Sequence, residues 1–121
     1  QEGLMGGKVD KNNAREGFRV PLHSVTGEYA FRGVVDRCEV VDISFSGIGL
    51  KVNNIVTEND VLDVRFRLEK DVRIYCKGKV VNVRGGRVGL NFIEIPPKAK
   101  KSIDKYIENY TNSNIGKLMD K

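Results

Sequence analysis

Alternation of apolar and polar positions runs through most of the chain and predicts a protein built from strands. The clearest run places the apolar residues between Leu62 and Leu68 on one face, with Arg65 and Arg67 on the other. Such a two-residue period is that of a strand with one buried and one exposed side. Six strands are predicted, over residues 18–22, 34–44, 48–52, 61–68, 72–84 and 88–95.

Small and turn-forming residues separate these runs. We predict turns at Thr26-Gly27-Glu28 and at Ser46-Gly47, and a two-residue hairpin turn at Gly85-Gly86. Pro21 restricts the first strand to a sheet edge or a strand end, because proline has no N–H to donate to a neighbouring strand.

The period changes after Pro96-Pro97, where residues 98–110 show the spacing of an amphipathic helix. The apolar stripe consists of Ile103, Tyr106, Ile107 and Tyr110. The pattern therefore predicts a mainly all-β fold, a six-stranded antiparallel, Greek-key-like β-barrel with a C-terminal α-helix. The helix is expected either to cover one opening of the barrel or to dock a neighbouring domain.

Three segments follow from this division. We expect a flexible, polar N-terminal segment at 1–14, the barrel with its helix at 15–110, and a polar tail at 111–121. The first residues resemble neither a translation start nor a signal peptide, so we expect this chain to be a piece of a longer protein. We also expect it to act through an attached effector domain or a protein partner.

Composition narrows the function classes. A formal net charge of +5 favours an anionic partner. Cys38 and Cys76 lie inside strand runs and are predicted to be buried free thiols of a cytoplasmic protein. His23 is the only histidine, and the sequence has no Ser/His/Asp or Cys/His arrangement, no metal-ligand cluster and no phosphate-binding Gly-rich loop. We therefore expect no metal site, no cofactor and no enzymatic activity. No run is long and apolar enough for a membrane span.

Two arginines, Arg15 and Arg19, stand where the flexible segment meets the first strand. Guanidinium groups match phosphate oxygens and the O6/N7 edge of guanine, and they stack on bases. With one arginine on each side of the hinge, the pair is predicted to close on a ligand. The competing interpretation is a solvated basic surface.

A second cluster lies at the end of the strand at 34–44. Asp42 and Ser44 are two residues apart and project from the same face of an extended strand. A carboxylate accepts hydrogen bonds from the N1–H and amino group of guanine, and Gly47 and Gly49 allow a ligand close to the backbone. The competing interpretation is a turn in which these side chains bond to local N–H groups.

Together, in this order and at these places, the two clusters resemble the motifs of the PilZ domain. Arg15-x-x-x-Arg19 precedes the first strand, and Asp42-x-Ser44-x-x-Gly47 follows later in the chain. The last strand and the helix also resemble that family, so the resemblance covers residues 13 to 110. PilZ domains are bacterial receptors for cyclic di-GMP.

The resemblance implies that Arg15 and Arg19 hold phosphates and guanine, and that Asp42, Ser44 and Gly47 line the guanine pocket. Gly49 and Ala14 are secondary candidates. Ala14 stands where family members that bind two intercalated ligands often have a further arginine, so the resemblance favours one ligand per domain.

The function implied is a cytoplasmic cyclic di-GMP receptor that changes conformation on binding and regulates motility, biofilm or exopolysaccharide formation, or virulence. The alternative is a PilZ-like module that works only through protein contacts, without ligand. Binding of RNA or single-stranded DNA is disfavoured, because such surfaces set aromatic platforms among basic residues and most aromatic residues here fall at core positions.

Overall fold

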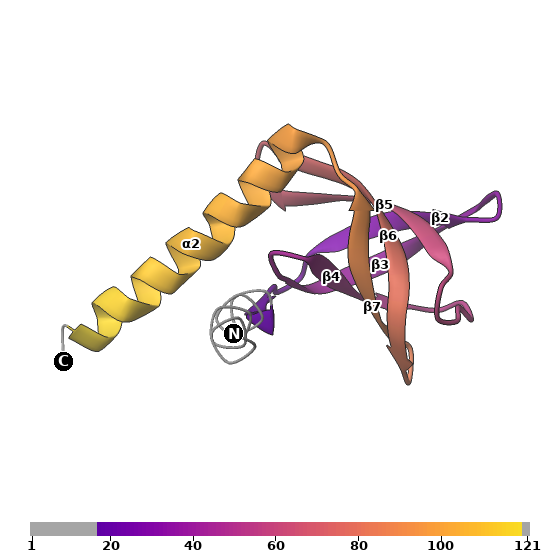
Figure 1. The fold of residues 1–121 in the computed structure, drawn as a ribbon, viewed down its shortest axis with the longest axis horizontal. Helices are drawn as coiled ribbons and strands as arrows, with labels where there is room; N and C mark the ends of the chain where they lie inside the picture. The colour runs from indigo at the N-terminus through magenta and orange to yellow at the C-terminus, as the bar shows by residue number, and fades with distance from the viewer. Residues whose placement is uncertain (1–16, 120–121) are drawn as a thin grey trace, which may run out of the picture.

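The computed structural model describes residues 17–119, so Ala14, Arg15 and the predicted flexible segment at 1–14 lie outside it. Figure 1 shows a barrel of strands with one long helix at its C-terminal end. The strands are β1 (Val20–Pro21), β2 (Thr26–Phe31), β3 (Val34–Ile43), β4 (Gly47–Val52), β5 (Val61–Glu69), β6 (Val72–Arg84) and β7 (Arg87–Glu94), and the helix is α2 (Pro97–Met119).

Six of the strands close into a barrel. Their order is β3-β2-β5-β6-β7-β4, and a further pairing of β3 with β4 completes the ring. Every pairing is antiparallel. The strands β2-β3-β4 and β5-β6-β7 form two meanders, and β1 adds to β3 outside the ring. The predicted six-stranded barrel with a C-terminal helix is thus confirmed.

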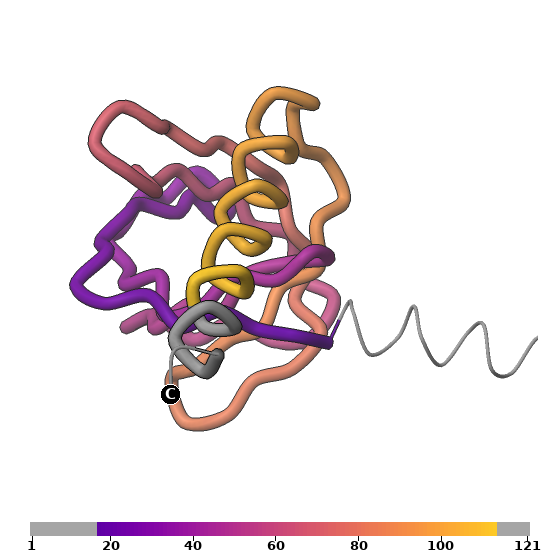
Figure 2. Tube along the Cα trace, turned by 90° about the vertical axis from the view of Figure 1, so that its left-hand side faces the viewer, coloured from indigo at the N-terminus to yellow at the C-terminus, as the bar shows by residue number. Residues whose placement is uncertain are grey.

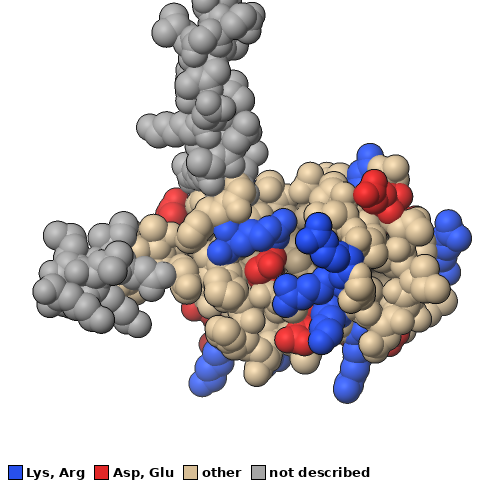
Figure 3. Space-filling view, turned by 90° about the horizontal axis from the view of Figure 1, so that it is seen from below, with Lys and Arg blue, Asp and Glu red and all other residues tan. Residues whose placement is uncertain are grey.

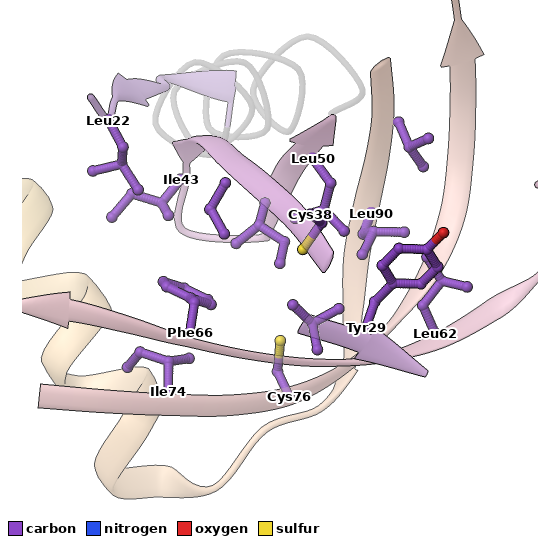
Figure 4. Close-up of a cluster of buried hydrophobic side chains, with 14 of the residues drawn as sticks. Leu22, Tyr29, Cys38, Ile43, Leu50, Leu62, Phe66, Ile74, Cys76 and Leu90 are labelled. Carbon is purple, nitrogen blue, oxygen red and sulfur yellow. The ribbon is translucent and has the colours of Figure 1, made fainter. Parts of the chain in front are cut away.

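The interior is filled by every second residue of the strands, as the two-residue period predicts. Figure 4 shows this core, with the sulfur atoms of Cys38 and Cys76 among its aliphatic side chains. Both cysteines are buried and free, as predicted. The largest fully buried side chains are Tyr29, Ile43, Ile48, Leu50, Leu62, Ile74, Leu90, Ile103 and Ile107.

The predicted turn at Thr26-Gly27-Glu28 is wrong, because these residues begin β2. Gly27 allows close packing instead: a Cβ there would lie 2.5 Å from the carbonyl oxygen of Arg65 on β5. The turn comes later, at Arg32-Gly33, where both residues have positive φ, 53° and 81°. A two-residue turn of that kind matches the twist of the paired strands.

The first predicted strand, 18–22, is reduced in the structure to β1, Val20–Pro21. The predicted number of six still equals the number of strands in the closed barrel, because two differences compensate. The sequence pattern missed β2, which belongs to the ring, and counted β1, which lies outside it. The Gly85-Gly86 turn is confirmed, with φ values of 55° and 84°.

Helix α2 covers one end of the barrel, as Figure 2 shows. Ala99, Ile103 and Ile107 are buried on its inner face, at the spacing of successive turns. The predicted helix ended at Tyr110, whereas α2 continues to Met119. The prediction stopped early because the residues after Tyr110 have low helix propensity; once formed, a helix gains one hydrogen bond for each residue added.

Candidate functional site

A row of four residues crosses the outer face of the barrel from β3 to β6. Asp42 pairs with Gly49, Gly49 with Gly89, and Gly89 with Asn82. Directly paired residues on one face lie about 5 Å apart. The row therefore places a carboxylate and a carboxamide at the two ends of a floor made of two glycines.

The glycines leave the space that these two side chains occupy. A Cβ on Gly49 would lie 2.5 Å from Oδ1 of Asp42, and a Cβ on Gly89 would lie 2.8 Å from Nδ2 of Asn82. Asp42 and Asn82 thus bend over the glycine floor from opposite sides. Their polar groups therefore lie over neighbouring glycines on the outer face of the barrel.

A β-bulge precedes each of these polar residues. The register shifts between Val40 and Asp42 on β3, and again between Val80 and Asn82 on β6. An extra residue in one strand bends it and redirects the following side chain, which is why bulges are frequent beside functional sites. Here the two bulges turn Asp42 and Asn82 to the same face as the glycines.

Arg19 contacts the carboxylate end of the row. Its Nη1 donates a hydrogen bond to Oδ1 of Asp42 at 2.7 Å. The pairing of β1 with β3 sets Pro21 opposite Asp42 and so holds Arg19 nearby. The side chains are 39% and 22% exposed, so a ligand has access to both. Because ion pairs at such exposed positions contribute only about 0–1 kcal/mol, a ligand can replace this contact at little cost.

The next row along the same strands is mainly basic and begins with Glu39 on β3, opposite Lys51. Lys51 on β4 pairs with Arg87 on β7, and Arg87 pairs with Arg84 across the hairpin turn. Figure 3 shows Lys and Arg side chains gathered around a few acidic ones on the underside of the barrel. A shallow hollow of about 140 Å³ is lined by Arg19, Asp42, Gly49, Asn82 and Arg87, among others. The guanidinium groups, the carboxylate and the amide of this hollow suit a ligand that combines a planar polar group with a negative charge.

Ser44 closes the turn between β3 and β4 and is almost fully buried, at 1% exposure. Its Oγ accepts the N–H of Gly47 at 3.1 Å and that of Ser46 at 3.3 Å, and it donates to the carbonyl of Gly47 at 3.2 Å. Gly47 in turn allows β4 to approach β7, since a Cβ there would lie 1.8 Å from the carbonyl oxygen of Leu90. Both residues shape the hairpin that carries Asp42.

Of the residues predicted from the sequence, the structure brings Arg19, Asp42 and Gly49 together in one site. Ser44 and Gly47 lie at the neighbouring turn, and Arg15 and Ala14 are outside the described residues. Asn82 and Arg87 were missed, and so was Gly89. The available signal was a glycine inside a strand, which marks a bulge or a close approach.

Among residues 17–119, no group of three His, Cys, Asp or Glu residues is arranged to hold a metal ion. Burial, with a further contribution from the charge of Asp36, raises the pKa of Cys38 to about 11, and burial raises that of Cys76 to about 12. Both thiols are therefore protonated at neutral pH. No helix in the described range is long and apolar enough to cross a membrane.

Comparison with known families gives a match over most of the chain. A family model described as PilZ domain matches residues 13–109. A search of curated proteins found no match.

Several solved structures share the fold. The PilZ domain with cyclic di-GMP of YcgR from Escherichia coli has a TM-score of 0.63 at 12% identity, over 84% of this chain and 94% of that one. The PilZ domain of CeSA from a cellulose-synthesizing bacterium has a TM-score of 0.60 at 14% identity, over 78% and 99%. Borreliella burgdorferi PlzA in complex with cyclic di-GMP has a TM-score of 0.58 at 20% identity, over 86% of this chain but 45% of that one.

A fourth similar structure is the inhibitor of motility from Bacillus subtilis, with a TM-score of 0.65 at 18% identity. The aligned region covers 78% of this chain and 50% of the inhibitor. The chain thus spans about half the length of the inhibitor and of PlzA. At these identities the likeness establishes the fold.

Proposed function

Because this chain belongs to the PilZ domain family, we propose that it is a receptor for cyclic di-GMP and that the ligand binds on the row from Asp42 to Asn82. The observation that carries the proposal is the 2.7 Å contact between Arg19 and Asp42. These residues belong to two separate motifs, 23 positions apart, and the pairing of β1 with β3 unites them on an exposed face.

The chemistry of the row matches one guanine of the ligand. The carboxylate of Asp42 accepts hydrogen bonds from the N1–H and the amino group, which adenine does not present in that arrangement. The amide of Asn82, beside it, adds a donor and an acceptor for the same base. Arg19 and Arg15 hold phosphate oxygens or stack on guanine, and Arg87 adds a positive charge at the opposite end.

Ser44 and Gly47 have a supporting place in this proposal. They lie at the turn that follows Asp42, and the hydrogen bonds of Ser44 fix that turn. A fixed hairpin holds the carboxylate in position before the ligand arrives, which lowers the entropy lost on binding.

Two of the similar structures contain the proposed ligand: the PilZ domain of YcgR and the PlzA protein are complexes with cyclic di-GMP. Binding rather than catalysis is proposed because the site supplies forked donors and an acceptor for recognition, and the nearest thiols are buried and protonated.

In this proposal the ligand acts as a switch for a cytoplasmic partner or an attached effector domain. Contacts to Arg15 and Arg19 order residues 8–19 across the barrel and change the surface shown to the partner. The outputs we propose are motility, biofilm or exopolysaccharide formation, or virulence, and the similarity to an inhibitor of motility supports the first. Hydrogen exchange in residues 8–19 should slow on adding cyclic di-GMP; unchanged exchange at saturation would refute the switch.

Base specificity tests the site itself. Cyclic di-AMP is expected to bind at least about a hundredfold more weakly than cyclic di-GMP, because it leaves the Asp42 carboxylate without its two donors. Asp42→Ala should weaken cyclic di-GMP binding about tenfold to a hundredfold, from charge-assisted bonds of about 1.5–3 kcal/mol each.

The matched control is Asp71→Ala, which removes an exposed carboxylate from the β5–β6 turn and should leave affinity unchanged. If the wild-type chain shows no affinity for either dinucleotide, the chain is instead a PilZ module that works through protein contacts alone.

A further inference from the structure

Arginine side chains dominate a second face of the barrel, on β3, β5 and the first half of β6, with β2 between β3 and β5. Strands β2 and β5, at the middle of this face, lie across the ring from the β4–β7 pair that forms the glycine floor. Arg67 on β5 pairs directly with Arg73 on β6. Glu28 on β2 lies between Arg37 and Arg65, its partners on either side. All five side chains are exposed.

This arrangement does not help the barrel to fold. Like charges directly opposite each other on neighbouring strands are destabilising. Arg65 is paired with Glu28 at 2.7 Å, but among the described residues no carboxylate lies within ion-pair distance of the guanidinium groups of Arg37, Arg67 or Arg73. The face therefore holds three unneutralised guanidinium groups that an external anion would stabilise.

The face is also hollowed. A depression of about 670 Å³ is lined by the four arginines together with Glu28 and Tyr75. A second depression, of about 620 Å³, continues past Tyr75 toward Lys70 and Lys98. Tyr75 borders both and is 48% exposed. Arginine and tyrosine are the residue types that most often supply binding energy at protein interfaces.

We propose that this face, which we call the arginine face, binds an acidic segment of a partner protein. Carboxylates of the segment would form forked hydrogen bonds with Arg67 and Arg73, and an apolar side chain between them would pack on Tyr75. The proposal is independent of cyclic di-GMP binding, because none of these residues belongs to the row from Asp42 to Asn82.

A protein segment fits this face better than a nucleic acid does. Glu28 and Asp63 stand among the arginines and would repel a continuous phosphate backbone. Single-stranded nucleic acids also need aromatic platforms for their bases. Tyr75 is the exposed aromatic residue bordering these hollows, and its hydroxyl donates to Asp63 at 3.2 Å.

The first test compares two variants of equal charge. Arg67→Glu/Arg73→Glu changes the arginine face, and Lys101→Glu/Lys105→Glu changes two exposed lysines on α2. Each pair of substitutions lowers the net charge by four, from +5 to +1. The probe is a fluorescein-labelled peptide of about ten residues, roughly 33 Å when extended, with alternating Glu, Ser, Asp and Leu. Its anisotropy is measured in about 0.15 M salt, where distant charges are screened.

The arginine variant should bind the peptide at least about tenfold more weakly than wild type, and the lysine variant should match wild type. Equal losses in both variants, or no loss in the first, would overturn the proposal. Tighter binding of a thymidine oligonucleotide than of the peptide would also overturn it. Cyclic di-GMP affinity should be unchanged in the arginine variant, which separates this proposal from the one above.

Thermal unfolding provides a second readout. Arg67→Glu alone replaces a repulsive cross-strand pair with an attractive one opposite Arg73, so the melting temperature should rise. A rise means that Arg67 is held at the expense of stability, as a binding residue would be. A lower melting temperature would show that Arg67 stabilises the barrel, and the proposal would fail.

Discussion

Gly49 offers a sharp test of how the site is built, because its missing side chain makes room for the carboxylate of Asp42. In Gly49→Ala, the new Cβ would lie 2.5 Å from Oδ1, 3.0 Å from Cγ and 3.1 Å from Oδ2 of that residue. All three distances are shorter than ordinary contacts, so the carboxylate must rotate away. Its contact with Arg19 at 2.7 Å would then be lost or lengthened.

The effect on stability should be small. The group that must move is the end of a side chain, and an exposed ion pair contributes only about 0–1 kcal/mol. Alanine also costs less entropy than glycine inside a strand, by roughly 0.5–1 kcal/mol. These contributions nearly cancel, so the free energy of unfolding should change by no more than about 1 kcal/mol.

The effect on binding should be large. Because the oxygens of Asp42 accept hydrogen bonds from guanine in the proposed complex, displacing them removes bonds of about 1.5–3 kcal/mol each, and cyclic di-GMP affinity should fall about tenfold to a hundredfold. Calorimetric titration measures the affinity, and urea denaturation measures the stability of the same preparation.

A double-mutant cycle supplies the control. Once Asp42→Ala has removed the carboxylate, adding Gly49→Ala should cause no further loss of affinity. Unchanged affinity in Gly49→Ala alone would show that the ligand does not bind the Asp42 carboxylate in this position. An additive loss in the double variant would contradict an effect through Asp42, since the alanine methyl group would then act on the ligand directly.

Three further outcomes follow from the packing. Gly47→Ala should lower the free energy of unfolding by about 3 kcal/mol or more in urea denaturation. The new Cβ would lie 1.8 Å from the carbonyl oxygen of Leu90, and a backbone atom cannot rotate away. A loss under about 1 kcal/mol would contradict this packing. Ser44→Ala should cost about 1–3 kcal/mol in the same assay, since it leaves buried N–H groups of the turn without an acceptor, and unchanged stability would show that water replaces the hydroxyl. Cys38 and Cys76 should not react with a thiol reagent at about pH 8 until the protein is unfolded. Fast labelling of the native protein would contradict the burial. Burial raises the pKa of Cys38 from 9.0 to about 11 and that of Cys76 from 9.0 to about 12. The stability that the two protonated thiols contribute is therefore complete below pH 9.0 and is lost as pH rises through the folded-state pKa values.

The barrel was predictable because its strands alternate cleanly and some of its turns carry glycine. The strand at Val61–Glu69 and the turn at Gly85-Gly86 are examples. The strand β2 was missed because Gly27 suggested a turn, although it serves the close approach of β2 and β5. In a sequence, a glycine that forms a turn looks the same as a glycine that lets two strands approach closely. Only the position of the neighbouring strand distinguishes the two.

The site was predictable in part. Arg19 and Asp42 belong to motifs that can be recognised in the sequence, and the structure brings them into contact. Asn82 could not be predicted, since its position depends on the register of β6 with β7 and on a bulge before it. For Ser44 the sequence left two interpretations, a ligand contact and a hydrogen bond to the N–H groups of a local turn. The hydrogen bonds of its Oγ in the structure are those of the turn.

Whether this chain is a cyclic di-GMP receptor is tested most directly by a calorimetric titration of the full chain with that ligand. We expect saturable binding with a dissociation constant in the micromolar range or below, about −8 kcal/mol or stronger, with one ligand molecule per chain and a marked loss in Asp42→Ala. No heat of binding up to about 100 μM ligand, where a micromolar site would be saturated, would contradict it.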